Sequence, residues 1–134
     1  MLLDGLSYND HFLSPDEQRT LVQTILALDF VHDRFRGQQL KRRYAQFGYA
    51  YASTGRRLTP APAFPPFLTA IVEKANARHP SGVAFDQCII THYPPGAGIG
   101  WHTDAAGFGE VIIAVSLGPV LTAVATPTSR PRRW

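Results

Sequence analysis

The stretch Asp86–Asp104, DQCIITHYPPGAGIGWHTD, decides how the rest of the sequence is interpreted. Its first part, Cys88–Tyr93, is rich in β-branched residues and predicts a strand, and the Pro94-Pro95-Gly96 that follows predicts a turn. Ile99–Asp104 predicts a second strand. Because side chains alternate between the two faces of a strand, His102 and Asp104 project to the same side. The sequence therefore predicts an imidazole and a carboxylate close together on one strand.

The His102-Thr103-Asp104 tripeptide has the chemistry of a metal half-site. An imidazole nitrogen and a carboxylate oxygen on one face can occupy two neighbouring positions on one ion. One further histidine from a facing strand would complete the 2-His-1-carboxylate triad of non-haem iron, which leaves three open positions. The tripeptide alone is weak evidence, because a surface polar pair gives the same pattern, so the surrounding sequence has to decide.

The surrounding sequence resembles the AlkB-like Fe(II)/2-oxoglutarate dioxygenases. The likeness is strongest over Asp86–Asp104 and continues through Phe108-Gly109 to Ile113–Gly118, which resembles the next strand of that family. Upstream, Gln46–Tyr51 and the proline-rich segment Pro60–Pro66 also resemble the family. The resemblance covers residues 6 to 118.

This resemblance implies an α+β fold, a double-stranded β-helix (jelly roll) with N-terminal supporting helices. It implies Fe(II) held by His102 and Asp104, with 2-oxoglutarate as co-substrate and O₂ as oxidant. Tyr93 stands where the family has a tyrosine that contacts 2-oxoglutarate, and Thr91 stands where many members have an asparagine for the same purpose. The implied reaction is oxidative dealkylation of alkylated nucleic-acid bases.

Strand parity supports part of this assignment. Thr91 and Tyr93 share one face of the predicted strand, whereas Cys88, Ile90 and His92 share the other. His92 is therefore a poor candidate for a further iron ligand. The remaining histidines belong to helical or loop segments and are interpreted as ordinary polar residues; they are His11, His32 and His79.

Local patterns outside this stretch predict two helices and further strands. Ser14-Pro15-Asp16-Glu17 has the form of a capping box with proline at the first helical position, and it predicts a helix over residues 15–28. Apolar spacing predicts a second helix over 66–78. Aromatic alternation from Tyr44 to Ser53 predicts a strand or hairpin. Val111–Leu117 predicts a strand buried on both faces.

Composition bounds the class of protein. The chain has 134 residues, 45% of them apolar, which is enough for one globular domain with a core. No stretch approaches the roughly 18 apolar residues of a membrane span. Asp4 follows Met1-Leu2-Leu3 without a basic segment, so we expect no signal peptide and no membrane partner. Cys88 is interpreted as a buried thiol, and a cytoplasmic location is expected.

Charge is unevenly distributed along the chain. The net charge of +3 comes from three arginines in the tail, because residues 1–119 hold equal numbers of acids and bases. Between Arg34 and Arg57 there are basic residues and no acid, interleaved with aromatic rings; the basic residues are Arg34, Arg36, Lys41, Arg42, Arg43, Arg56 and Arg57. Cations and rings are what a nucleic-acid surface needs. From composition alone, a solvated loop with inward-packed rings is the better interpretation.

The family resemblance reverses that preference, because the family's nucleotide-recognition lid falls in this segment. It implies substrate contacts from the basic and aromatic residues Arg42, Arg43, Tyr44, Tyr49 and Tyr51, whose rings could stack on an unstacked base. Repair members often carry an acid two positions beyond the metal aspartate, whereas this chain has Ala106. DNA, RNA and protein substrates therefore all stay open.

Two family features have no match in this sequence. No histidine follows His102, and the arginines after it are Arg130, Arg132 and Arg133, in a segment without a strand pattern. We expect a partial dioxygenase domain over 1–118, with its C-terminal strands missing, and an atypical, disordered tail over 119–134, as a truncation or frameshift would give. The function is then either an impaired dealkylating dioxygenase or a non-catalytic fragment with weak nucleic-acid binding.

Overall fold

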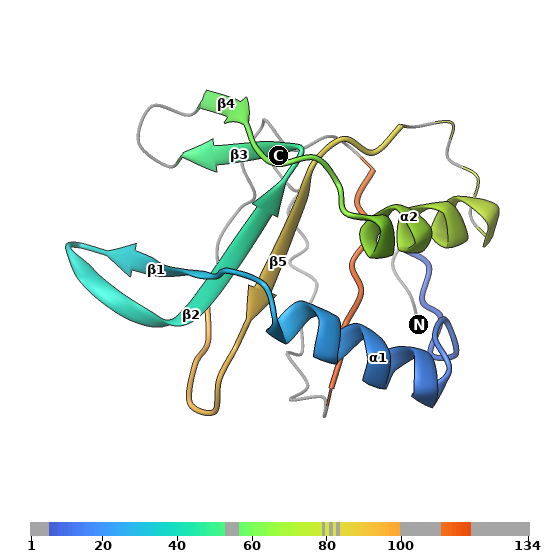
Figure 1. The fold of residues 1–134 in the computed structure, drawn as a ribbon, viewed down its shortest axis with the longest axis horizontal. Helices are drawn as coiled ribbons and strands as arrows, with labels where there is room; N and C mark the ends of the chain where they lie inside the picture. The colour runs from blue at the N-terminus through green and yellow to red at the C-terminus, as the bar shows by residue number, and fades with distance from the viewer. Residues whose placement is uncertain are drawn as a thin grey trace. The chain divides into compact units, whose positions relative to one another are not determined.

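The computed structural model describes residues 6–52, 57–78, 80, 82, 84–99 and 111–118. These residues divide between two compact units. Residues 6–28 and 114–118 belong to the first unit, and the described residues from 29 to 113 belong to the second. Among the described residues, the first unit contains helix α1, whereas the second contains helix α2 and all five strands (Figure 1).

Helix α1, Pro15–Leu26, begins as the sequence predicts. The Ser14 hydroxyl accepts a hydrogen bond from the Glu17 backbone N–H (3.1 Å), and the Glu17 carboxylate accepts one from the Ser14 N–H (3.0 Å). This reciprocal pair satisfies two backbone donors, and Pro15 has no N–H to satisfy. The helix ends at Leu26, two residues before the predicted end, because the Leu28 N–H bonds the Ile25 carbonyl in a tighter turn.

A three-stranded antiparallel sheet lies in the second unit, with β2 in the centre. Strand β1 is Val31–Phe35, β2 is Gln38–Phe47 and β5 is Cys88–His92, in the order β1-β2-β5 (Figure 1). Arg36 and Gly37 connect β1 to β2 and both have positive φ, 51° and 78°. Two positive φ values in a two-residue connection are the mark of a type I′ turn, whose twist matches that of the strands. Strand β1 was not predicted from the sequence.

A second, two-stranded sheet follows β2. Strand β3, Tyr49–Ala52, pairs antiparallel with β4, Arg57–Pro60, and we call this pair the β3–β4 ribbon. The predicted strand or hairpin over 44–53 is thus the end of β2 and all of β3, separated by Gly48. Gly48 has φ +77°, its N–H donates to the Pro62 carbonyl, and its own carbonyl accepts from Ala61 N–H.

Helix α2, Pro66–Arg78, has the predicted bounds. It starts after the proline-rich segment, where the Pro65 carbonyl accepts hydrogen bonds from the N–H groups of Leu68 and Thr69. Leu68 and Ala75 are buried on this helix, and Ala45 is buried on β2. The α+β class predicted from the sequence is confirmed. The jelly roll itself stays a prediction.

The predicted strand over Val111–Leu117 is wrong. These residues have no regular secondary structure, and the side chains of Val111, Ile112 and Ile113 are 41%, 49% and 38% exposed. A strand needs a neighbouring strand to satisfy its backbone groups, and neither of the two described sheets, β1-β2-β5 and β3-β4, includes this segment. Residues 111–117 therefore have the apolar composition of a strand but lack the neighbouring strand that they would need to pair with.

We predict that Gly48→Ala destabilises the protein much more than Gly37→Ala. Both glycines have positive φ, which costs an alanine about 1–2 kcal/mol. A Cβ at Gly37 would meet nothing within 4 Å, whereas one at Gly48 would overlap the Asp86 carbonyl and approach the Phe64 ring at 3.0 Å. Overpacking of this kind adds roughly 1–3 kcal/mol. Denaturant unfolding of both variants measures the difference; equal losses would contradict the close approach of Asp86.

Candidate functional site

The register between β2 and β5 fixes which residues share a face of the sheet. Tyr44 stands opposite Thr91, and Arg43 stands opposite His92. Val31 on β1 is paired with Tyr44, so Val31, Tyr44 and Thr91 form a row on one side, which we call the Tyr44 face. Arg43 and His92 lie on the opposite side, the Arg43 face. The predicted co-substrate contact Thr91 and the predicted substrate contact Tyr44 are therefore neighbours.

Tyr93 follows the last residue of β5, and its side chain is 44% exposed. Ile89, which shares the Tyr44 face with Thr91 by alternation, is 43% exposed. The Arg43 face is more enclosed, since it includes the buried Ala45. On the Tyr44 face, Tyr44 and Thr91 are half-buried, whereas Val31 and Ile89 beside them are exposed.

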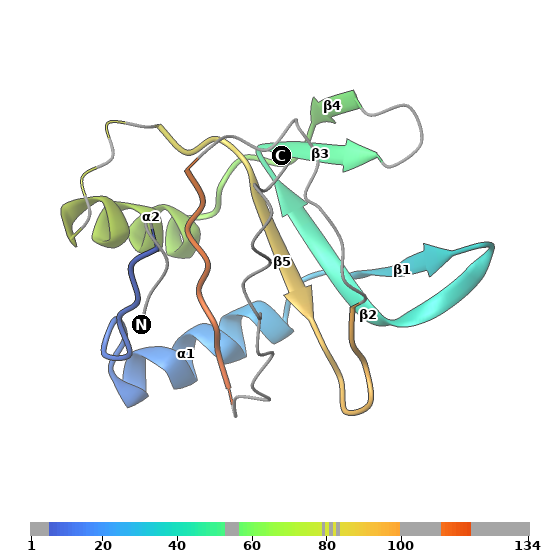
Figure 2. The same ribbon diagram turned by 180° about the vertical axis from the view of Figure 1, so that it is seen from behind.

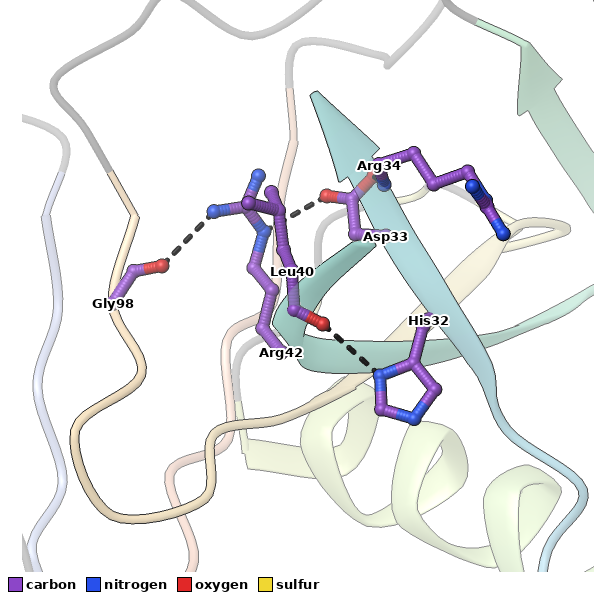
Figure 3. A network of polar contacts seen from close by, with 6 residues as sticks. All are labelled: His32, Asp33, Arg34, Leu40, Arg42 and Gly98. Carbon is purple, nitrogen blue, oxygen red and sulfur yellow. Dashed lines mark hydrogen bonds and ion pairs between the residues drawn. The ribbon is translucent and has the colours of Figure 1, made fainter. Parts of the chain in front are cut away.

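Arg42 is held between two other segments (Figure 3). Its Nε–H donates to Asp33 Oδ2 (2.8 Å), and its Nη1 donates to the Gly98 carbonyl (2.9 Å). By strand alternation Arg42 shares the Tyr44 face. Its side chain is 19% exposed, so most of its surface is already covered by protein.

Arg43 points away from Arg42 and belongs to a different cluster. Its Nε–H donates to His92 Nδ1 (2.9 Å), and its guanidinium lies 4.8 Å from the centre of the Phe30 ring. His92 can accept this hydrogen bond only while its ring is neutral, because a protonated Nδ1 has no lone pair to accept with. Burial, followed by the charge of Arg43, lowers the pKa of His92 below its ordinary value. The structure therefore separates two neighbouring arginines that the sequence analysis grouped together.

The His92 geometry agrees with its exclusion as an iron ligand. Because Nδ1 accepts from Arg43, the proton of the neutral ring is on Nε2, which then has no lone pair for a metal. His32 Nδ1 bonds the Leu40 carbonyl (3.0 Å), and a carbonyl can only accept, so that nitrogen carries the proton (Figure 3). His11 is an exposed residue beside Asp10. His79 lies outside the described residues.

One exposed aromatic ring, that of Tyr49, lies on the β3–β4 ribbon. Tyr49 is opposite Pro60, and Tyr51 is opposite Leu58. Alternation places Tyr49 and Leu58 on the same face, and their side chains are 40% and 41% exposed. The ribbon therefore presents an accessible ring at Tyr49. Only the backbone of Tyr51 is described.

Cys88 is a half-buried free thiol. Burial raises its pKa to about 11, so the thiol is neutral near pH 7 and a poor nucleophile. This supports the interpretation of Cys88 as a structural residue.

Comparison with known proteins identifies the family. The model of the 2OG-Fe(II) oxygenase superfamily matches residues 5–131. The chain belongs to this superfamily. It is also 30% identical over 120 residues to the Xenopus tropicalis protein named tRNA (carboxymethyluridine(34)-5-O)-methyltransferase alkbh8. That match covers 85% of this chain and 19% of the relative, so the chain spans about a fifth of that protein's length. No solved structure matches the chain significantly.

Oxygenases of this superfamily use Fe(II), 2-oxoglutarate and O₂. The two donors named from the sequence, His102 and Asp104, have the chemistry that Fe(II) requires. Both lie outside the described residues, as does Ala106. Within the described part of the chain, no three metal-binding side chains come together. The donor chemistry of the half-site fits iron, and its third ligand stays unassigned.

Two further sequence expectations concern the limits of the domain and the membrane. The family match runs to residue 131, past the boundary at residue 118 expected from the sequence. Residues 119–134 lie outside the described residues, so that boundary and the disordered tail stay predictions. None of the helices in the described ranges has the length and apolar character needed to cross a membrane.

Sequence reasoning missed the partners that determine which cations are accessible. Asp33 immediately precedes the basic run and forms an ion pair with Arg42, nine residues later. Phe30, which precedes the same run by four residues, stacks with Arg43. The signal for β1 was Val31 and Phe35 at the ends of a short run that is followed by a turn containing Gly37, and it would have placed Asp33 opposite the first half of β2.

We predict that the Arg43–His92 pair makes stability depend on pH. The pKa of His92 is lower in the folded protein than the ordinary value of 6.5, so the unfolded chain binds the proton more tightly. The stabilisation from neutral His92 is therefore fully present above pH 6.5 and is lost as the pH falls through the lower folded-state pKa. In His92→Gln, an amide oxygen can still accept from Arg43 and does not titrate.

The measurement is the free energy of unfolding between pH 7.5 and 5. The wild type should lose more stability on acidification than His92→Gln. His11→Gln is the matched control, since that side chain is 90% exposed and should leave the pH dependence of the wild type intact. Parallel curves for wild type and His92→Gln would mean that the hydrogen bond to Arg43 does not control protonation.

Proposed function

We propose that this chain carries the N-terminal and metal-binding part of a 2OG-Fe(II) dioxygenase that oxidatively dealkylates nucleic-acid bases. The observation that carries the proposal is the pairing of Tyr44 with Thr91 on one face of the sheet. Thr91 belongs to the expected co-substrate contact and Tyr44 to the expected base contact. An oxidant formed at the co-substrate can only reach a substrate carbon held beside it. Support also comes from the relative whose name refers to tRNA, which favours RNA as the substrate.

The proposed reaction consumes one 2-oxoglutarate and one O₂ for each N-methyl group. Fe(II), when bound, supplies the means to decarboxylate 2-oxoglutarate to succinate and CO₂ and to insert one oxygen atom into the methyl C–H bond. The resulting N-hydroxymethyl group breaks at its C–N bond, which releases formaldehyde and returns the N–H of the base. Each oxygen atom of O₂ is accounted for, one in succinate and one in formaldehyde.

The residues of this chain have separate roles in that proposal. His102 and Asp104 would supply one nitrogen and one oxygen ligand to the metal. The Tyr93 hydroxyl would donate to a carboxylate of 2-oxoglutarate, and Thr91 would offer a shorter and weaker contact than the asparagine of many relatives. The Tyr44 ring, across the ladder from Thr91, would stack on the base.

The nucleic-acid contact is proposed to centre on the tip of the β1–β2 hairpin. Arg42 and Arg43 are engaged with Asp33 and His92, so they offer less to phosphates than the sequence suggested. At the tip, Phe35 is 60% exposed and the Arg36 guanidinium lies 5.2 Å from the centre of its ring. A cation beside an exposed ring suits a single strand, which offers both a phosphate and an unstacked base.

We predict that Arg36→Asn weakens single-stranded RNA binding without weakening the fold. Arg36 has a positive φ, which asparagine adopts more readily than arginine in a type I′ turn before glycine. Stability should therefore be kept or increased while one phosphate contact is lost. The slope of log K for RNA binding against log salt concentration should become shallower by roughly 0.7, the contribution of that one contact.

Arg19→Asn is the matched control, because it removes one charge from an exposed residue of α1. Binding is measured by titration of a labelled oligonucleotide at several salt concentrations. An Arg36→Asn variant that binds like Arg19→Asn would contradict the assignment of the hairpin tip. Single-stranded DNA of the same sequence, in a parallel titration, tests the preference for RNA.

We predict that the chain binds Co(II) through His102 and Asp104, and that turnover of 2-oxoglutarate by this 134-residue chain is slow. Two named protein ligands hold an ion less firmly than three, and burying the distal carboxylate of 2-oxoglutarate without a cation would cost several kcal/mol. His102→Ala should abolish Co(II) binding in a titration followed by absorbance, and equal binding in both proteins would remove the site assignment.

Succinate and formaldehyde release from an N-methylated oligonucleotide tests the reaction itself. Metal binding without either product would favour the alternative, a non-catalytic fragment that retains weak nucleic-acid binding. Succinate formed by the wild type and not by Asp104→Ala would overturn it. Succinate stimulated by a protein in place of the oligonucleotide would move the substrate class to protein.

A further inference from the structure

The contacts of Arg42 tie together three segments that are distant in the sequence. Asp33 lies on β1, Arg42 on β2, and Gly98 on the segment that follows β5 (Figure 3). The two donors used, Nε and Nη1, point in different directions from one planar group, so neither bond can turn without disturbing the other. We call this arrangement the Arg42 bridge.

The irregular part of the β1–β2 ladder is built around the Arg42 bridge. The register shifts between His32 and Arg34, so that Asp33 alone faces the three residues between Gln39 and Arg43. The Leu40 carbonyl, which lies in this interval, is bonded by the His32 ring. Asp33 uses its second carboxylate oxygen, Oδ1, to accept from the Arg34 N–H (2.9 Å). The carboxylate that orients Arg42 is therefore itself fixed by the backbone.

In the sequence, Gly98 lies between the residue proposed to contact 2-oxoglutarate, Tyr93, and the proposed metal ligand His102. Tyr93 is five residues before it and His102 four residues after it. The chain reverses at a turn in which the Ala97 N–H donates to the Pro94 carbonyl, and it then runs back beside β2 (Figure 2). A Cβ at Gly96 would approach Lys41 Nζ at 3.2 Å, so the end of this β2 side chain reaches the turn. Through the Gly98 carbonyl, Arg42 thus anchors the chain where the segment that leads to His102 begins.

We infer that Arg42 is a positioning residue, which fixes the start of the metal-bearing segment against β2 and does not bind phosphate. This inference rests on the proposed function for the assignment of His102 and Asp104. The ion pair with Asp33 argues against a phosphate contact, because a phosphate would have to compete with a carboxylate already 2.8 Å from Nε. The geometry suits a role in which the guanidinium orients two segments of the protein.

Three variants separate positioning from phosphate binding. Arg42→Lys keeps the charge and loses the planar fork, so it retains a phosphate contact and breaks the bridge. Asp33→Asn removes the orienting charge and leaves Arg42 in place, so a phosphate-binding Arg42 would bind RNA more tightly in this variant. Arg34→Gln is the matched control, because it removes an exposed arginine from the same hairpin and leaves the bridge intact.

The measurements are Co(II) affinity, RNA affinity and amide hydrogen exchange. Arg42→Lys and Asp33→Asn should each weaken Co(II) binding about tenfold. This is the smaller of the losses that usually follow when a residue supporting the metal ligands is removed. Amides of residues 96–99 should exchange faster in both variants, whereas those of the β2–β5 ladder should be unchanged, which shows that the fold is kept. RNA affinity should not increase in Asp33→Asn, and Arg34→Gln should match the wild type in metal binding.

The failures of the two proposals are distinguishable. Unchanged Co(II) affinity in Arg42→Lys and Asp33→Asn, beside its loss in His102→Ala, would overturn the positioning role alone. Tighter RNA binding by Asp33→Asn would assign Arg42 to the phosphate backbone and overturn it as well. A wild type that binds no Co(II), or binds it equally after His102→Ala, would overturn the metal site and the positioning role together.

Discussion

The antiparallel ladder between β2 and β5 is the constraint on which the candidate site depends. Side chains on a strand alternate with a period of two, so one register sets the face of every residue along both strands. With Tyr44 opposite Thr91, the residues expected to contact the base and the co-substrate come to the same face. A shift of one residue would put Arg43 beside Thr91 and leave Tyr44 on the opposite face from Thr91. The chemistry proposed for this protein therefore depends on backbone pairing before it depends on any single side chain.

The same alternation gives two neighbouring arginines different environments. Arg42 is paired with a carboxylate and a carbonyl, so its charge is compensated and its donors are used. Arg43 has a neutral imidazole and an aromatic ring, which compensate its charge less completely. The cost of that environment appears on the histidine, whose pKa is lowered in part by Arg43. A run of like charges in a sequence therefore does not predict how positive the protein surface is until the partner of each charge is known.

Local signals in the sequence were sufficient for the helices and for the parity of β5. The capping box at Ser14 and the proline-led start of α2 depend on residues within one turn of the helix, so no distant contact had to be known. The order of faces at Thr91 and His92 follows from alternation alone. Strand β1 was missed because Arg36-Gly37 is a weaker turn signal than Asn-Gly, and β4 because only four residues form it.

What could not be predicted depends on pairing across the chain. The apolar segment 111–117 has the composition of a strand, but the described sheet gives it no partner, and sequence alone does not supply one. The placement of Tyr44 beside Thr91 required the register, and the engagement of Arg42 required Asp33 and Gly98 to meet it from two sides. Local structure could thus be predicted from the sequence wherever a few adjacent residues determine it.

These partners also change the meaning of the charge balance. Residues 1–119 hold equal numbers of acidic and basic side chains, which suggests a surface without a strong field. Asp33, however, forms its ion pair with Arg42 of β2 and not with the arginines of the hairpin tip. The tip at Arg34 and Arg36 keeps its positive charge beside an exposed ring. A segment that is neutral overall can therefore present a local cationic surface, because the acid nearest to the tip in the hairpin is already paired with an arginine of the sheet.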